Sequence, residues 1–117
     1  MSVDAAKEIK LRLRADLRAA LRDGRGAEVK MIRSLLAAVD NAEAPPLPAG
    51  QTAPGEDATN RSAEVKRLRL DEAQVRAALL AEIEEREGAA VELERLERTE
   101  RAASLRAEAA VGRRYLK

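Results

Sequence analysis

Basic side chains early in the chain are the residues whose type and spacing best suit ligand binding. They recur every three or four residues, so an α-helix would place them along one side. A row of cations of this kind can follow a phosphate backbone and therefore predicts RNA binding. The more common origin of such a row is a solvated helix face whose long side chains cover the edge of a thin hydrophobic core, and both interpretations stay open. The candidates, one of them from the next predicted helix, are Lys7, Lys10, Arg14, Arg18, Arg22 and Arg33.

Two charged residues occupy positions that helical spacing assigns to apolar faces. Arg86 falls between Ile83 and Ala90, and Glu43 continues the apolar stripe of an earlier helix. A charge buried alone costs several kcal/mol, so each residue should have a partner of opposite charge. We predict that Arg86 pairs with Glu43 or Glu108 between helices. Such a pair would fix the register of the helices, with a ligand-binding or catalytic role as the alternative.

The chain offers little material for catalysis. It has no Cys, His, Trp or Phe, and Tyr115 is its single aromatic residue. Thiol and histidine nucleophiles, disulfides, the usual zinc sites and platforms for base stacking are therefore excluded. The segment from Gly24 to Gly26 lacks the third glycine and the preceding strand of a phosphate-binding loop. We predict no catalytic residue, no metal and no cofactor.

The composition favours helices in a single domain. Of the 117 residues, 37% are charged and 45% are hydrophobic, with many alanines and few strand-forming residues. The net charge is +1, so any attraction to nucleic acid must come from a local patch. No apolar run approaches the roughly 18 residues of a membrane span, and the start of the chain has no apolar leader. We therefore expect an all-α cytoplasmic protein with no membrane partner.

Apolar spacing predicts the helices that position these residues. A first helix spans about residues 6–21 and a second contains residues 29–39, and the glycines between them predict a short turn and an antiparallel hairpin. Residues 44–60 hold all four prolines, which predicts a mobile loop. A short helical turn is predicted for residues 61–68.

The strongest local signal marks the start of a third helix. Asp71 can cap that helix with Gln74 closing a capping box, while Leu70 and Val75 form a hydrophobic staple. A break near Thr99, as N-cap, would start a fourth helix. Glu-to-Arg pairs four residues apart would each stabilise the helices by about 0.2–0.5 kcal/mol. These pairs are Glu8–Arg12, Glu72–Arg76, Glu82–Arg86, Glu94–Arg98 and Glu97–Arg101.

The segment MIRSLLAAVDNAE, residues 31–43, resembles the second helix of the YqeY-like family, which is related to the tail domain of the B subunit of glutamyl/aspartyl-tRNA amidotransferase. In that family the helix reads leucine-arginine, then spaced apolar residues, then asparagine-alanine-glutamate. The likeness continues through residues 70–116. One departure is Leu96-Glu97, where the family tends to have alanine-glycine, so the third and fourth helices are expected to join differently. The matching positions are Asp71, Glu72, Val75, Leu79, Glu82, Ile83, Arg86, Arg98, Glu108, Val111, Tyr115 and Leu116.

The resemblance implies that residues 1–117 form the multihelical N-terminal domain of that family, without its smaller C-terminal domain. In the amidotransferase, the tail region helps to hold tRNA, while amide transfer and glutamine hydrolysis belong to other domains and subunits. The function expected is a non-catalytic binding module for tRNA or another RNA. The alternative is a protein-binding adaptor or a module that forms homo-oligomers. A third reading, association with a glutamine-dependent carbon-nitrogen ligase, follows from the family's labels alone.

Overall fold

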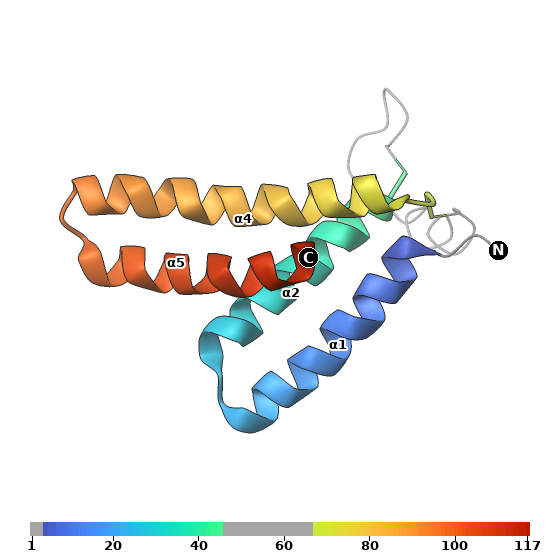
Figure 1. Ribbon diagram of the computed structural model, residues 1–117, viewed down its shortest axis with the longest axis horizontal. Helices are drawn as coiled ribbons and strands as arrows, with labels where there is room; N and C mark the ends of the chain where they lie inside the picture. Colours follow the sequence, from blue (N-terminus) through green and yellow to red (C-terminus); the bar gives the residue numbers. More distant parts are fainter. Residues whose placement is uncertain (1–3, 46–66) are drawn as a thin grey trace, which may run out of the picture.

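The computed structural model describes residues 4–45 and 67–117, and every regular element within those ranges is helical (Figure 1). This confirms the prediction of an all-α multihelical bundle. The predicted loop at 44–60 and the predicted turn at 61–68 fall mostly outside the described residues, and the described part of the turn, 67–68, is not helical. The elements are α1 (Ala5–Asp23), α2 (Gly26–Glu43), α4 (Glu72–Arg95), α5 (Thr99–Arg113) and the 3-10 turn η1 (Arg114–Leu116).

The helices form two antiparallel hairpins that cross each other. In Figure 1, α1 and α2 make one hairpin, α4 and α5 make the other, and α2 passes behind the second hairpin and packs against both of its helices. Helix α1 meets α4 only near the start of each helix. The far end of the α4–α5 hairpin extends beyond the first hairpin (Figure 1).

The turn between α1 and α2 depends on Gly24. Its φ angle is 68°, in the left-handed region that glycine adopts without strain. The amide of Arg25 reaches back to the carbonyl oxygen of Ala20 at 2.9 Å and so satisfies the end of α1. Helix α2 then begins at Gly26, which confirms the short antiparallel connection.

The predicted start of the third helix is confirmed in detail. The carboxylate of Asp71 accepts a hydrogen bond from the Gln74 amide at 2.8 Å, and the Gln74 side-chain oxygen accepts one from the Asp71 amide at 2.9 Å. Leu70 and Val75 are both buried in the core beside this box. The signal is reliable because all of its parts lie within six consecutive residues and need no distant element.

The predicted N-cap at Thr99 is wrong. Thr99 is the first residue of α5, and the capping position belongs to Arg98, whose side chain makes no capping bond. The connection is instead built from the end of α4. The amides of Arg98 and Glu97 bond the carbonyl oxygens of Leu93 and Glu94 at 2.8 and 3.0 Å, while Glu97 adopts a φ of 59°. This is a Schellman ending with glutamate where glycine is usual.

The strain at Glu97 predicts a stabilising substitution. Placing a Cβ atom in the left-handed region costs about 1–2 kcal/mol, whereas the extra freedom of glycine in the unfolded chain costs about 0.4–1 kcal/mol. Glu97→Gly is therefore expected to raise the free energy of unfolding by about 0.5–1 kcal/mol, measured by urea denaturation. Glu97→Ala, which keeps the Cβ atom, is the control. A Glu97→Gly protein no more stable than Glu97→Ala would contradict the assignment of strain.

The hydrophobic core lies where the two hairpins cross. The core is thin, because it contains few large side chains. Every element contributes to it, including η1 through Tyr115. Tyr115 is 7% exposed and donates its hydroxyl hydrogen to the carboxylate of Asp16 on α1. Burial is the main cause that raises the pKa of Tyr115 far above its ordinary value, and the contact with Asp16 adds to it. The largest fully buried side chains are Leu13, Met31, Ile32, Leu35, Val39, Leu79 and Ile83.

Candidate functional site

Four of the predicted RNA-binding residues form an exposed row on the outer side of α1. At 100° per residue they span an arc of about 80°, directed away from the core. The structure gives none of them an ion pair with a described carboxylate. Arg33 is also exposed, on the neighbouring helix α2. We call the four residues on α1, without Arg33, the α1 basic row: Lys7, Arg14, Arg18 and Arg22.

Lys10 does not belong to this row. It is only 9% exposed, and its ammonium group lies 3.2 Å from the Asp40 carboxylate and pairs with Glu43. Its position on α1 is at the border between the apolar stripe and the basic face, so it turns toward α2 rather than outward. The prediction that placed Lys10 among the exposed cations is therefore wrong.

Glu43 finds its partners on α1 and just before α4. It is 6% exposed, and besides Lys10 its carboxylate accepts a hydrogen bond from Arg67 at 3.4 Å. Its backbone oxygen accepts the amide of Leu68 at 2.7 Å. The end of α2 is thereby joined both to α1 and to the residues just before α4. A buried carboxylate with this many donors holds the fold together and offers no free acid or base.

Arg86 pairs with Glu108, one of its two predicted partners, and not with Glu43. Its Nε lies 3.0 Å from the Glu108 carboxylate on α5, and its Nη2 donates to the Ser34 hydroxyl on α2 at 2.7 Å. A third contact reaches Glu82 one turn earlier at 3.2 Å. Burial alone would lower the pKa of Arg86, but the hydrogen bonds and charges of Glu108 and Glu82 outweigh it and raise that pKa. One guanidinium thus joins three helices.

Two exposed ion pairs bridge α4 and α5 across the hairpin. Arg106 holds both oxygens of Glu94 at 2.9 and 2.7 Å, and Arg113 holds both oxygens of Glu87 at 2.7 Å. These forked hydrogen bonds lower the pKa values of Glu94 and Glu87 below their ordinary range. The sequence did not reveal them, because the register of two antiparallel helices is set by the length of their connection rather than by spacing along either helix.

Of the five pairs predicted four residues apart, only Glu82–Arg86 forms in the structure. Glu94 is taken by Arg106, whose forked contact is stronger than a single local one. Arg12 and Arg76 turn instead toward the last turn of the chain. The guanidinium of Arg12 lies 4.6 Å from the centre of the Tyr115 ring, and Arg76 donates to the backbone oxygen of Leu116.

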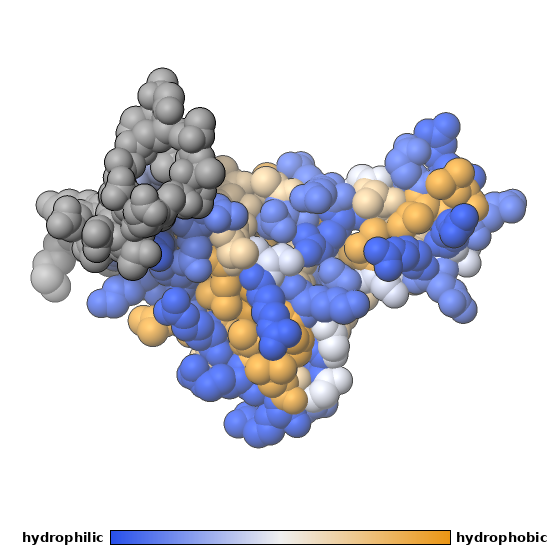
Figure 2. Space-filling model, turned by 180° about the vertical axis from the view of Figure 1, so that it is seen from behind, coloured by the Kyte–Doolittle hydropathy of each residue, from blue (hydrophilic) through white to orange (hydrophobic). Residues whose placement is uncertain are grey.

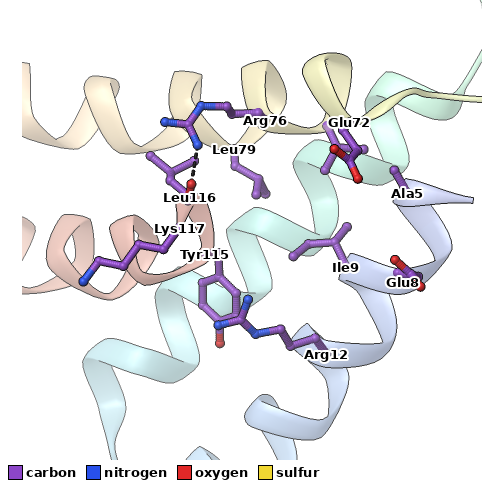
Figure 3. A pocket seen from close by; sticks show the side chains of 11 residues that line it. Ala5, Glu8, Ile9, Arg12, Glu72, Arg76, Leu79, Tyr115, Leu116 and Lys117 are labelled. Atoms are coloured by element: carbon purple, nitrogen blue, oxygen red, sulfur yellow. Dashed lines mark hydrogen bonds between the residues drawn. The ribbon is translucent and has the colours of Figure 1, made fainter. Parts of the chain in front are cut away.

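A groove of about 470 Å³ lies between the starts of α1 and α4 and is closed at one end by η1 (Figure 3). Its walls come from three segments that are distant in the sequence, so spacing along the chain does not predict it. Its floor is apolar and its rim carries charges of both signs. We call it the α1–α4 groove, and its lining is Ala5, Glu8, Ile9, Arg12, Glu72, Val75, Arg76, Leu79, Tyr115, Leu116 and Lys117.

Apart from the α1–α4 groove, exposed apolar side chains gather at the free end of the α4–α5 hairpin (Figure 2). Val91 and Leu96 are 47% and 67% exposed there. On α1, Leu11 and Leu21 are exposed among the cations of the α1 basic row. These leucines add apolar contact area to a surface that is otherwise positively charged.

Within residues 4–45 and 67–117, no group of three or more side chains is arranged to hold a metal ion. None of the helices in the same ranges combines the length and apolar character needed to cross a membrane. No protein-family model, curated protein or solved structure matches the chain.

Proposed function

We propose that this chain is a non-catalytic module that binds RNA through the α1 basic row. The observation that carries the proposal is four exposed cations on one side of a helix with no described carboxylate paired to them. Many other arginines of the described chain are engaged by carboxylates, as Arg106 and Arg113 are. Cations left without counter-charges are the groups that phosphates can neutralise.

The spacing of the row suits a phosphate backbone. Arg14, Arg18 and Arg22 follow one another at intervals of four residues, about 6 Å along the helix axis. That interval is comparable to the distance between successive phosphates of one strand, and Lys7 extends the row by two turns. The row contains no aromatic side chain, so it has no means of stacking on bases. We therefore expect binding that depends on charge and shape and shows little preference for sequence.

A non-catalytic role is supported by how the buried charges are used. The Lys10–Glu43 pair and the Arg86–Glu108 pair each satisfy their own members inside the fold. No buried side-chain nitrogen or oxygen of the described residues lacks a hydrogen-bond partner. The resemblance to an amidotransferase tail domain, which helps to hold tRNA, favours tRNA as the first RNA to test.

The test is a fluorescence-anisotropy titration of labelled tRNA across a range of salt concentrations. Each phosphate neutralised contributes about −0.9 to the slope of log K against log salt, so four contacts predict a slope of about −3 to −4. Replacing Arg14, Arg18 and Arg22 together by Glu is expected to weaken binding by at least about 100-fold. All three residues are exposed, so the fold should survive, which circular dichroism would verify.

A matched control makes the same change of charge elsewhere. Replacing Arg95, Arg98 and Arg101 by Glu alters the free end of the α4–α5 hairpin and should weaken binding by less than about threefold. Equal losses in both triple variants would show that only net charge matters and would contradict a site on α1. No binding by the unmodified protein at low salt, together with a dimer in light scattering, would instead favour the adaptor or oligomerisation module.

A further inference from the structure

The α1–α4 groove has two walls that carry the same order of chemical groups. Along α1 the order is Glu8, Ile9 and Arg12, and along α4 it is Glu72, Val75 and Arg76. Both helices start at the same side of the groove, so the two carboxylates lie at one end and the two guanidiniums lie toward η1 (Figure 3). The groove is therefore negative at one end and positive at the other.

These charges do not neutralise one another along their own helices. Each wall has a Glu and an Arg four residues apart, the spacing that favours a local ion pair, yet neither pair forms. Arg12 lies over the Tyr115 ring and Arg76 bonds a backbone oxygen, and neither guanidinium is paired with a carboxylate of the described residues. The carboxylates of Glu8 and Glu72 are likewise without a partner among residues 4–45 and 67–117.

The floor between the two ends is apolar. Ile9 and Leu79 lie there, with Val75 from the second wall, and the core continues beneath them. Lys117 also lines the η1 end, and its side chain points away from the groove in Figure 3. A ligand carrying a single charge would leave the charged side chains at one end of the groove unpaired. A ligand without an apolar middle would leave the apolar floor in contact with water.

From this arrangement we propose that the α1–α4 groove binds a zwitterion whose carboxylate and ammonium groups are separated by an apolar chain, of the class of ε-aminocaproate and lysine. The carboxylate lies between Arg12 and Arg76, and the ammonium lies between Glu8 and Glu72. Four helical residues separate the two ends of each wall, about 6 Å along the axis, which matches the reach of such a chain. The site is independent of RNA binding, because none of its residues belongs to the α1 basic row.

The first experiment uses the only aromatic residue of the chain as its probe. Tyr115 lies in the groove beneath Arg12, so a ligand that engages Arg12 changes the fluorescence of Tyr115. Titration with ε-aminocaproate is expected to give a saturable change. Caproate lacks the ammonium group and hexylamine lacks the carboxylate, and each should need about tenfold higher concentration. Equal responses to ε-aminocaproate and caproate would contradict a site with two charged ends.

The second experiment tests the charged residues of the groove by substitution. Binding is followed by nuclear magnetic resonance of the Val75 and Leu79 methyl groups, because a substitution of Arg12 would itself alter the surroundings of the Tyr115 fluorophore. Arg12→Gln and Glu72→Gln are each expected to weaken ε-aminocaproate binding by about tenfold. The Arg12 and Glu72 side chains are both exposed, so these variants should fold. Control variants at exposed positions outside the groove, Arg101→Gln and Glu85→Gln, should bind ε-aminocaproate as the unmodified protein does.

Two further titrations distinguish between the two possible sources of the ligand. Free L-lysine presents the chemistry of an amino acid, and Nα-acetyl-L-lysine presents that of a lysine at the end of a peptide. Saturable shifts of the Val75 and Leu79 methyl groups with either compound support the proposal and identify its source. Failure of ε-aminocaproate and both lysine compounds to shift these methyl groups would overturn it, as would Arg12→Gln and Glu72→Gln variants that bind as tightly as the controls.

Discussion

Replacing Arg86 by Met is expected to lower the free energy of unfolding by about 3–5 kcal/mol. The substitution removes the partner of Glu108, which is 8% exposed, and leaves its carboxylate in a poorly solvated position between α4 and α5. It also removes the donor that reaches Ser34 on α2. Urea denaturation at neutral pH, followed by circular dichroism, measures the loss. Because the methionine is similar in length, the change reports the lost charge and hydrogen bonds more than lost packing.

Two controls separate this effect from the loss of any ion pair. Arg95→Met breaks an exposed contact with Glu92 and should change stability by less than about 0.5 kcal/mol. Combining Arg86→Met with Glu108→Leu removes both charges, and much of the stability should return, because a buried pair replaced by apolar side chains is often neutral. A loss below about 1 kcal/mol for Arg86→Met alone would show that water solvates Glu108.

Features encoded within a few consecutive residues could be predicted from the sequence. The capping box at Asp71 and Gln74 and the turn at Gly24 involve neighbours only, so no knowledge of packing was needed. The position of Arg86 in an apolar stripe likewise indicated that its charge needs a partner of opposite charge. The partner's identity did not follow, because Glu43 and Glu108 are equivalent candidates until the helices are placed in space. The structure brings Glu43 to Lys10 instead.

The sites themselves depend on contacts that sequence spacing cannot rank. Local Glu-to-Arg pairs are each worth only tenths of a kcal/mol, so a second helix at the right distance readily displaces them. Arg106 captures Glu94 in this way, and the last turn of the chain draws Arg76 away from Glu72. The α1–α4 groove likewise depends on segments that lie far apart in the sequence. The α1 basic row could be predicted more fully, since exposure on one helix follows from periodicity alone, with Lys10 at its edge as the exception.

Two glycines in the second hairpin are expected to respond to the same substitution with opposite signs. A Cβ atom at Gly112 would lie 2.6 Å from Cγ1 of Ile83 and 2.6 Å from Cε of Met31. The methionine methyl can move, but the branched Ile83 side chain on α4 is held by the core around it. Gly112→Ala should therefore lower the free energy of unfolding by about 1–3 kcal/mol, despite the gain in helix propensity.

Gly88 is the matched control, because, apart from its own helix, no atom of the described residues lies within 4 Å of the Cβ that an alanine would place there. Gly88→Ala should raise the free energy of unfolding by about 0.5–1 kcal/mol through helix propensity alone. The two variants differ only in the crowding at Gly112, so the difference between their stabilities measures how closely α5 must approach α4 and α2. In a double-mutant cycle, Ile83→Ala should make Gly112→Ala less harmful, because it removes the atom that the new Cβ meets. Equal gains for both glycine variants would mean that α5 can retreat without loss, and the close crossing of the hairpins would then contribute nothing to stability.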